Sequence, residues 1–199
     1  MTTINVILGA ANDSAQEHDD NTLFVAAGTS VIPTSSTGAA STRIDAGFRL
    51  PAVTIPKGST VTASTTQVYV TAGTAVDVTI YGEAVDNAVD FAATADVVDR
   101  ARSTASVAWS ATGLTKTAFN TTPSLTAIYD ELVKRPGFVS NNAINLIFIG
   151  GSTTARALSC QAYAGSTTNC TKASITYTAG RAPAFPNPLA ARRTFLRNR

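Results

Sequence analysis

The sequence predicts an all-β fold: one β-sandwich domain with a short α-helix and an extended arm at each terminus. Threonine, serine, alanine and valine dominate the composition, whereas lysine, glutamate and leucine, which build exposed helices, are scarce. Short apolar runs recur about every ten residues with glycine-bearing turns between them, as in sandwiches. The 199 residues, 44% apolar and 14% charged, suffice for one well-cored domain.

The expected strands follow from alternation and from turn residues. In 60–70 and 75–83, apolar side chains recur at every second position, which places them on one face. Pro56 ends the strand before it, and Gly58 turns the chain. Residues 13–20 are polar and turn-rich, and the chain after Gly28 forms a loop through Ser41. The expected strands are a strand or arm within 1–9, then 23–28, 44–50, 60–70, 75–83, 105–110, 143–149, 155–163 and 170–178.

One segment, about 123–135, has the pattern of an α-helix. Thr122 is placed to cap its N-terminus, and Pro123 occupies the first helical position, where a missing N–H costs nothing. Pro136 and the glycine after it end the helix. We expect it to close one end of the sandwich with one apolar stripe, made of Leu125, Ile128, Leu132 and Val133.

Charge and proline divide the chain into a strand or arm at 1–12, the sandwich at 13–178 and a basic arm at 179–199. That last segment holds five of the 15 basic residues and no acid, which leaves ten basic against 13 acidic residues in the rest. Its prolines oppose helix and sheet. It is either a docking arm or a frayed terminus without a role. The residues expected to dock on a partner are Phe185, Leu189, Arg192, Arg193, Phe195 and Leu196, with Ile4, Val6 and Ile7 as a second arm.

Trp109 has two interpretations, a core side chain or an exposed platform for sugar stacking. The core is favoured, because Val107 shares its face and the tyrosines are scattered rather than clustered. Five arginines without lysine clusters or stacking aromatics argue against nucleic acid as a partner.

Asp13, Glu17 and Glu83 could supply oxygen ligands for Ca²⁺, but no EF-hand spacing is present, and ordinary solvated acids are the alternative. Glu83 could instead pair with Arg100 or Arg102. No metal or cofactor is therefore predicted.

No converging set of acid, base and nucleophile stands out, and His18 is the single histidine, so we expect no enzyme. The N-terminus has no basic leader, and no window approaches the roughly 18 apolar residues of a membrane span. We therefore expect synthesis in a cytoplasm and no membrane insertion.

Cys160 and Cys170 lie symmetrically about Gly165, which predicts a hairpin with the two thiols opposite each other. Cross-strand opposition places Cβ atoms about 4.5–5.5 Å apart, within reach of a disulfide after local twist. A disulfide formed outside the cell and two buried free cysteines both remain open.

The order of several short motifs resembles a known module. The motifs are Asp13–Glu17, Phe48-Arg49, Ile55–Gly58, Tyr81–Glu83, Arg100, Ser103–Ala105, Trp109, Glu131–Val133, Arg135–Phe138, Asn141–Ala143 and Ala173–Tyr177. In this order they resemble the jelly-roll β-sandwich module of bacteriophage particle proteins and of bacterial surface proteins of the DNRLRE type, which is similar to carbohydrate-binding modules. The resemblance covers roughly Asp13 to Thr178. It departs at Phe138, where a tryptophan is usual, and at Lys172-Ala173, where a proline is expected.

The resemblance implies a jelly-roll fold and a structural role in a virion, as a capsid decoration or cement protein or a head or tail accessory. The implied partners are the major capsid or tail proteins of the same particle, met in many copies or as a homo-oligomer. The alternative that it implies is a carbohydrate-binding or host-surface adhesion module with a surface glycan as ligand.

Overall fold

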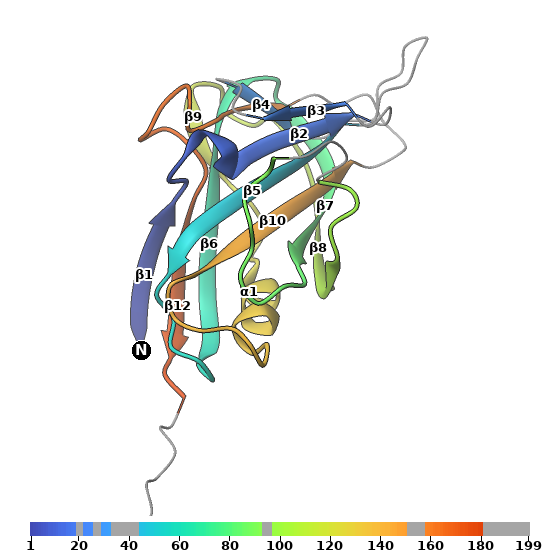
Figure 1. Ribbon diagram of the computed structural model, residues 1–199. Coiled ribbons are helices and arrows are strands. Elements are labelled where there is room, and N and C mark those ends of the chain that lie inside the picture. Colours follow the sequence, from blue (N-terminus) through green and yellow to red (C-terminus); the bar gives the residue numbers. More distant parts are fainter. Residues whose placement is uncertain (19–21, 26–28, 33–43, 93–96, 151–157, 181–199) are drawn as a thin grey trace, which may run out of the picture.

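The computed structural model describes residues 1–18, 22–25, 29–32, 44–92, 97–150 and 158–180. Across these residues two antiparallel sheets form a β-sandwich, so the predicted all-β class is confirmed, while the jelly-roll connectivity stays a prediction (Figure 1). Sheet A has the order β1-β12-β6-β11-β4, with β9 also paired to β6, and sheet B has the order β3-β2-β5-β10-β7-β8. The elements are β1 (Thr2–Ile7), η1 (Ala11–Asp13), β2 (Ser14–His18), β3 (Leu23–Val25), β4 (Thr29–Ile32), β5 (Ile44–Val53), β6 (Thr60–Ala72), β7 (Ala75–Glu83), β8 (Arg102–Thr112), β9 (Ala118–Thr121), α1 (Thr126–Val133), β10 (Asn142–Gly150), β11 (Leu158–Gln161) and β12 (Lys172–Thr178).

The core lies between the inner faces of the sheets and is centred on three aromatic rings of sheet B. Phe48 and Phe148 meet edge to face at 5.3 Å between ring centroids, and Trp109 lies 6.5 Å from Phe148. Trp109 is 3% exposed, so its prediction as a core side chain is confirmed. Burial of each such ring stabilises the fold by about 1.5–3 kcal/mol.

Strand β5 continues three residues beyond the predicted end at Leu50. Leu50 pairs with Ile144 and Val53 with Asn142, so the pairing with β10 shifts register between them. Pro51 lies within this irregular stretch. Proline is tolerated there because it has no N–H group to donate to the hydrogen-bond ladder. The positive φ of Ala52, 52°, accompanies the shift. The turn predicted after Pro56 is present, and Gly58 has the left-handed φ of 74° that favours glycine there.

Helix α1 begins at Thr126, later than predicted, because the residues before it are held by other bonds. The Thr122 N–H donates to the Thr66 carbonyl at 3.0 Å. The Thr122 hydroxyl donates to the Pro123 carbonyl at 2.8 Å instead of capping the helix. The stripe of Leu125, Ile128, Leu132 and Val133 is buried as predicted.

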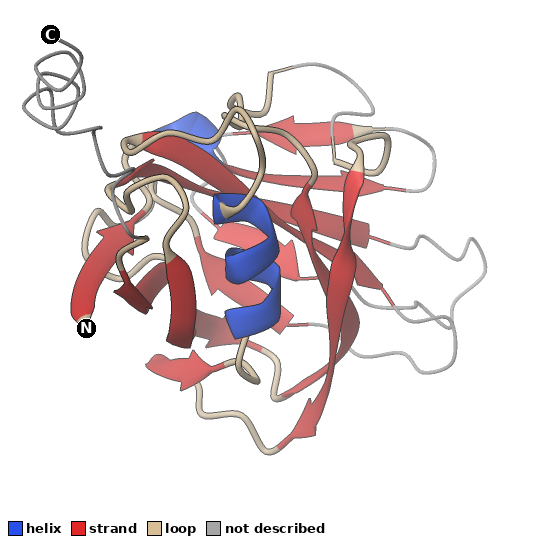
Figure 2. Cartoon of the chain, turned by 90° about the horizontal axis from the view of Figure 1, so that it is seen from below, coloured by secondary structure: helices blue, strands red, loops and turns tan. Residues whose placement is uncertain are grey.

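The helix lies between the two sheets and closes one end of the sandwich, as expected (Figure 2). Asp130 accepts the Val61 N–H of sheet A at 2.9 Å. Glu131 accepts the N–H groups of Thr104 and Ala105 of sheet B at 2.8 and 2.6 Å. Two neighbouring carboxylates of one helix therefore bind one strand of each sheet.

Three strands were missed by the sequence interpretation. Strand β2 occupies part of the polar segment 13–20, β4 lies in the segment interpreted as a loop, and β9 was not expected. In β2 the buried side chains include Ser14 and Glu17, so the strand has no apolar alternation to reveal it.

The predicted hairpin about Gly165 is wrong, because β11 and β12 pair with the same edge of β6. Cys160 pairs with Val70, and Lys172 pairs with Gln67. Both of these β6 residues have β9 as their other neighbour. Since both strands are antiparallel to β6, they run in the same direction along one line, and the segment between them is a loop rather than a hairpin turn.

Replacing Gly82 by alanine should loosen α1 from β7. A Cβ atom at Gly82 would lie 2.5 Å from Leu132 Cδ1 and 2.8 Å from Ile128 Cγ2, far inside van der Waals contact. We expect a loss of about 1–3 kcal/mol in the free energy of unfolding, measured by urea denaturation. Leu132→Ala makes room for the added methyl, so the double variant should lose less than the sum of the single variants. Additive losses would show that the contact between a methyl group at residue 82 and Leu132 does not limit how closely α1 packs on β7.

Candidate functional site

The described residues between β7 and β8, 84–92 and 97–101, pack on the outer face of sheet B, and we call them the covering segment. Phe91 in this segment lies directly on Gly47 of β5, where a Cβ atom would meet the ring at 2.3 Å. Around it forms a second apolar cluster outside the main core, made of Ala15, Phe91, Val97 and Ile147. The segment is therefore packed on the sheet instead of standing away from it.

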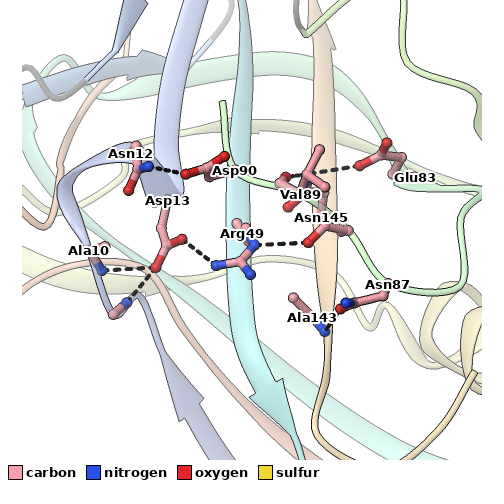
Figure 3. A network of polar contacts seen from close by, with 12 residues as sticks. Ala10, Asn12, Asp13, Arg49, Glu83, Asn87, Val89, Asp90, Ala143 and Asn145 are labelled. Atoms are coloured by element: carbon pink, nitrogen blue, oxygen red, sulfur yellow. Dashed lines mark hydrogen bonds and ion pairs between the residues drawn. The ribbon is translucent and has the colours of Figure 1, made fainter. Parts of the chain in front are cut away.

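A buried ion pair holds the middle of this segment. Arg100 Nη1 donates to Glu83 Oε2 at 2.8 Å and to the Val89 carbonyl at 3.0 Å, while Nη2 donates to the Asp90 carbonyl at 2.6 Å. Asn145 of β10 donates from Nδ2 to the same Glu83 oxygen at 2.7 Å and to the Val89 carbonyl at 3.0 Å (Figure 3). The Arg100 guanidinium also lies 4.4 Å from the centroid of the Phe91 ring, a cation–π contact.

Asp13 and Arg49 hold the start of the segment in a similar way. Asp13 Oδ2 accepts the N–H groups of Gly9 and Ala10, each at 2.8 Å, and Oδ1 accepts Arg49 Nη1 at 2.8 Å. Arg49 Nε donates to the Ala88 carbonyl at 3.0 Å (Figure 3). Asp13 is thus the link between the N-terminal chain, β5 and the covering segment.

Glu17 holds the far part of the segment. Its Oε2 atom accepts the N–H groups of Val97 and Val98 at 2.8 and 2.9 Å, and the side chain is fully buried. We call Asp13, Glu17, Arg49, Glu83, Arg100 and Asn145 together the polar clamp.

The three acids that the sequence offered as possible oxygen ligands for Ca²⁺ are members of the polar clamp. Asp13, Glu17 and Glu83 form no shared site, because Asp13 is bonded to Arg49, Glu17 to the Val97 and Val98 N–H groups and Glu83 to Arg100. Among the described residues, no group of three or more histidine, cysteine or acidic side chains is arranged to hold a metal ion. The alternative pairing of Glu83 with Arg100 is confirmed. Arg102 instead places its guanidinium 5.5 Å from the centroid of the Tyr81 ring.

Arg49 and Asn145 are the members of the clamp to which sequence reasoning assigned no role. Asn145 could have been identified from the sequence, because it interrupts an otherwise apolar run between Ile144 and Leu146. A buried amide in such a strand needs partners, and here they are a carboxylate and a backbone carbonyl. The role of Arg49 had no comparable local signal, since its partners lie 36 and 39 residues away in the chain.

A different arrangement lies on the outer face of sheet A, which carries a depression of about 400 Å³. Lys172 of β12 lines it and places its ammonium group 3.5 Å from the centroid of the Phe119 ring. Phe119 in turn meets Tyr69 edge to face at 5.2 Å. The residues that line the depression are Asn5, Val6, Ile7, Thr65, Gln67, Lys172, Ala173 and Ser174.

The predicted docking residues fall into two groups. Phe185, Leu189, Arg192, Arg193, Phe195 and Leu196 lie outside the described residues. At the N-terminus, β1 is a strand of sheet A paired with β12, not a separate arm. Val6 is buried, and Ile4 packs partly against the core, so a free second arm is wrong for these two residues. Ile7 remains 36% exposed.

Cys160 and Cys170 are free and buried, the second of the two alternatives from sequence. Burial raises the pKa of Cys170 from about 9.0 to about 11, and burial raises the pKa of Cys160 as well. Both thiols are therefore protonated at neutral pH and poorly reactive.

No family model matches the chain, and no curated protein matches it. In the part of the chain that the structure describes, α1 has eight residues, and none of the helices has the length and hydropathy that crossing a membrane requires.

Arg100→Met should destabilise the domain by about 3–5 kcal/mol, because it leaves the buried Glu83 carboxylate without its charge partner. Lys134→Met is the matched control. Lys134 pairs with Asp130 at 2.6 Å, but its side chain is 48% exposed, so its loss should cost less than about 1 kcal/mol. The free energy of unfolding of both variants is measured in urea. Similar small losses in the two variants would contradict a structural role for the clamp.

The two thiols should react with Ellman's reagent only after unfolding, with both cysteines then titrated in a sample kept free of reductant. The raised folded-state pKa of Cys170 stabilises the fold below about pH 9, and this contribution is lost as pH rises toward about 11. Cys170→Ala should therefore flatten the loss of stability in that interval. Absence of titratable thiol in the unfolded sample would show that the disulfide forms.

Proposed function

We propose that this chain is a non-enzymatic structural component of a bacteriophage particle, a capsid decoration or cement protein or a head or tail accessory. The order of motifs from Asp13 to Tyr177 is the first support, through its resemblance to the jelly-roll module of phage particle proteins. The partners are the major capsid or tail proteins, met in many copies.

The observation that carries the proposal is the place of the two chain ends on a rigid domain. Thr2 pairs with Tyr177, so β1 begins where β12 ends, at one end of the sandwich (Figure 1). The basic arm, 179–199, follows directly after β12 in the sequence. The chain therefore leaves the sandwich after β12 at the end where β1 begins.

The reach and charge of the arm fit docking on an adjacent subunit. Its 19 residues from Arg181 span at most roughly 60–70 Å when extended. Five arginines with no acid make it basic, while the rest of the chain has ten basic and 13 acidic residues. The basic arm is complementary in charge to the weakly acidic body of a neighbouring copy.

The polar clamp supports the same role by making the body rigid. The buried charges of the clamp bind the covering segment of the same domain and leave no acid–base pair directed at a substrate. A rigid body loses little conformational entropy on docking. Many copies on a symmetric shell then multiply a modest contact.

A carbohydrate-binding or host-surface adhesion module is the second candidate. The depression on sheet A favours it, because its lining includes amide and hydroxyl groups that can bond to a sugar beside apolar surface. A particle-borne sandwich can serve both roles.

The particle role predicts that the protein co-sediments with large particles. Density-gradient fractions of a native lysate, quantified by mass spectrometry against the major shell protein, test this directly. Many copies per particle would mean decoration, and a few would mean a vertex or tail component. Recovery only among small soluble proteins would contradict the proposal.

Truncation after Gly180 should leave the domain folded and abolish incorporation into particles. Gly180 still belongs to the domain, because a Cβ atom there would lie 2.3 Å from the Gly58 carbonyl oxygen. We expect the free energy of unfolding to change by less than about 0.5 kcal/mol. A Gly/Ser segment of equal length in place of residues 181–199 is the matched control and should fail as the truncation does. Normal occupancy of either variant would show that the arm does not dock.

A further inference from the structure

We propose that the depression on sheet A binds an acidic saccharide, a sugar unit that carries a carboxylate or a phosphate. The inference deepens the second candidate function and is independent of the particle role. It rests on the side chains that line the depression and on the position of one lysine.

The floor of the depression is ordered by the strand register. Asn5, Ser174 and Thr65 are cross-strand neighbours on β1, β12 and β6, and Ile7, Lys172 and Gln67 form the next row. Directly opposed side chains are about 5 Å apart, and the rows are separated by two residues, about 6.6 Å. This grid is built from three paired strands, so the Cα atoms of its polar residues are held in fixed relative positions.

The first row is free to bind a ligand. The side chains of Asn5, Thr65 and Ser174 make no hydrogen bond to any other described residue, and Asn5 and Thr65 are exposed. Gln67 donates from Nε2 to the Thr121 hydroxyl at 3.3 Å, which leaves its carbonyl oxygen available. Amide and hydroxyl groups both donate and accept, as sugar hydroxyls do. The row therefore complements a polyol better than it complements a carboxylate or an ammonium ion alone.

Lys172 determines the charge of the ligand. Its ammonium lies over the face of Phe119, across β6 from β1, so it stands at the rim of the depression toward β9. No described acidic side chain pairs with it, and none of the eight lining residues is acidic. An ammonium group offers only hydrogen-bond donors, so the ligand group that pairs best with it is an anionic acceptor.

The same contact argues against a neutral sugar. A neutral sugar ring gains affinity by stacking on an exposed aromatic face, but Lys172 lies over one face of Phe119, and Tyr69 forms a T-shaped pair with the same ring. Recognition here therefore depends on hydrogen bonds and on one charge rather than on stacking.

The test uses three methyl β-glucosides that differ only at C6: the neutral glucoside, the glucuronide with a carboxylate and the 6-phosphate. Binding to the full-length chain is followed by NMR through the backbone amide shifts. We expect shifts at Asn5, Lys172 and Ser174, and at least tenfold tighter binding of one or both acids than of the neutral glucoside. The carboxylate and phosphate arms identify which acid the site takes.

Two lysine variants and inorganic phosphate make the test decisive. Lys172→Gln should abolish the preference for acids while Lys172→Arg retains it, and Lys134→Gln, which removes a charge from α1, should leave binding unchanged. Phosphate alone should bind at least tenfold more weakly than the glucoside 6-phosphate. Equal binding of phosphate and its ester, loss of binding in Lys134→Gln, or no acid preference would overturn the inference. Saccharide shifts confined to other residues would overturn it while leaving the second candidate function intact, whereas no saccharide binding at all would contradict both.

Discussion

The buried ion pair between Arg100 and Glu83 is the contact on which the outer face of sheet B depends. Arg100 is 9% exposed and Glu83 is 7% exposed, so each charge loses most of its hydration, at a cost of several kcal/mol. The cost is offset because the pair also bonds to neighbours: Arg100 donates to two carbonyls of the covering segment, and Glu83 accepts from Asn145. An apolar pair would fill the same space without fixing those carbonyls. The ion pair therefore specifies where the segment lies.

The consequence is a sandwich with two different outer faces. Sheet B is covered by its own chain, with Phe91 placed on Gly47 and Glu17 holding Val97 and Val98. Sheet A carries a depression over β1, β12 and β6, and β1 begins where β12 ends (Figure 1). Contacts with other molecules are thus expected on sheet A and at the end where β1 begins and β12 ends, which is where both proposals place them.

Periodicity in the sequence predicted the strands with regular apolar alternation. The remaining strand positions depend on contacts between residues far apart in the chain. Strand β7 matches its predicted range, Ala75–Glu83, because its alternation is strict. Strand β2 was missed because its buried Glu17 accepts hydrogen bonds from amide groups 80 and 81 residues away. The predicted Cys160–Cys170 hairpin is wrong because both strands pair with β6, which lies far away in the sequence and aligns them along one edge. For the polar clamp, sequence identified the pairing of Glu83 with Arg100, and the fold supplied the roles of Arg49 and Asn145.

Native-state hydrogen exchange at the Phe91, Val97 and Val98 amides tests most directly whether the covering segment is locked onto sheet B. The account predicts opening free energies close to those of the β10 amides, because these three N–H groups bond to Asn12 and Glu17 in a packed layer. In Glu17→Gln, protection at Val97 and Val98 should fall while that of β10 is largely retained. Rapid exchange of all three amides in the unaltered chain, with β10 fully protected, would mean that the segment is a loose loop and that the clamp does not hold it.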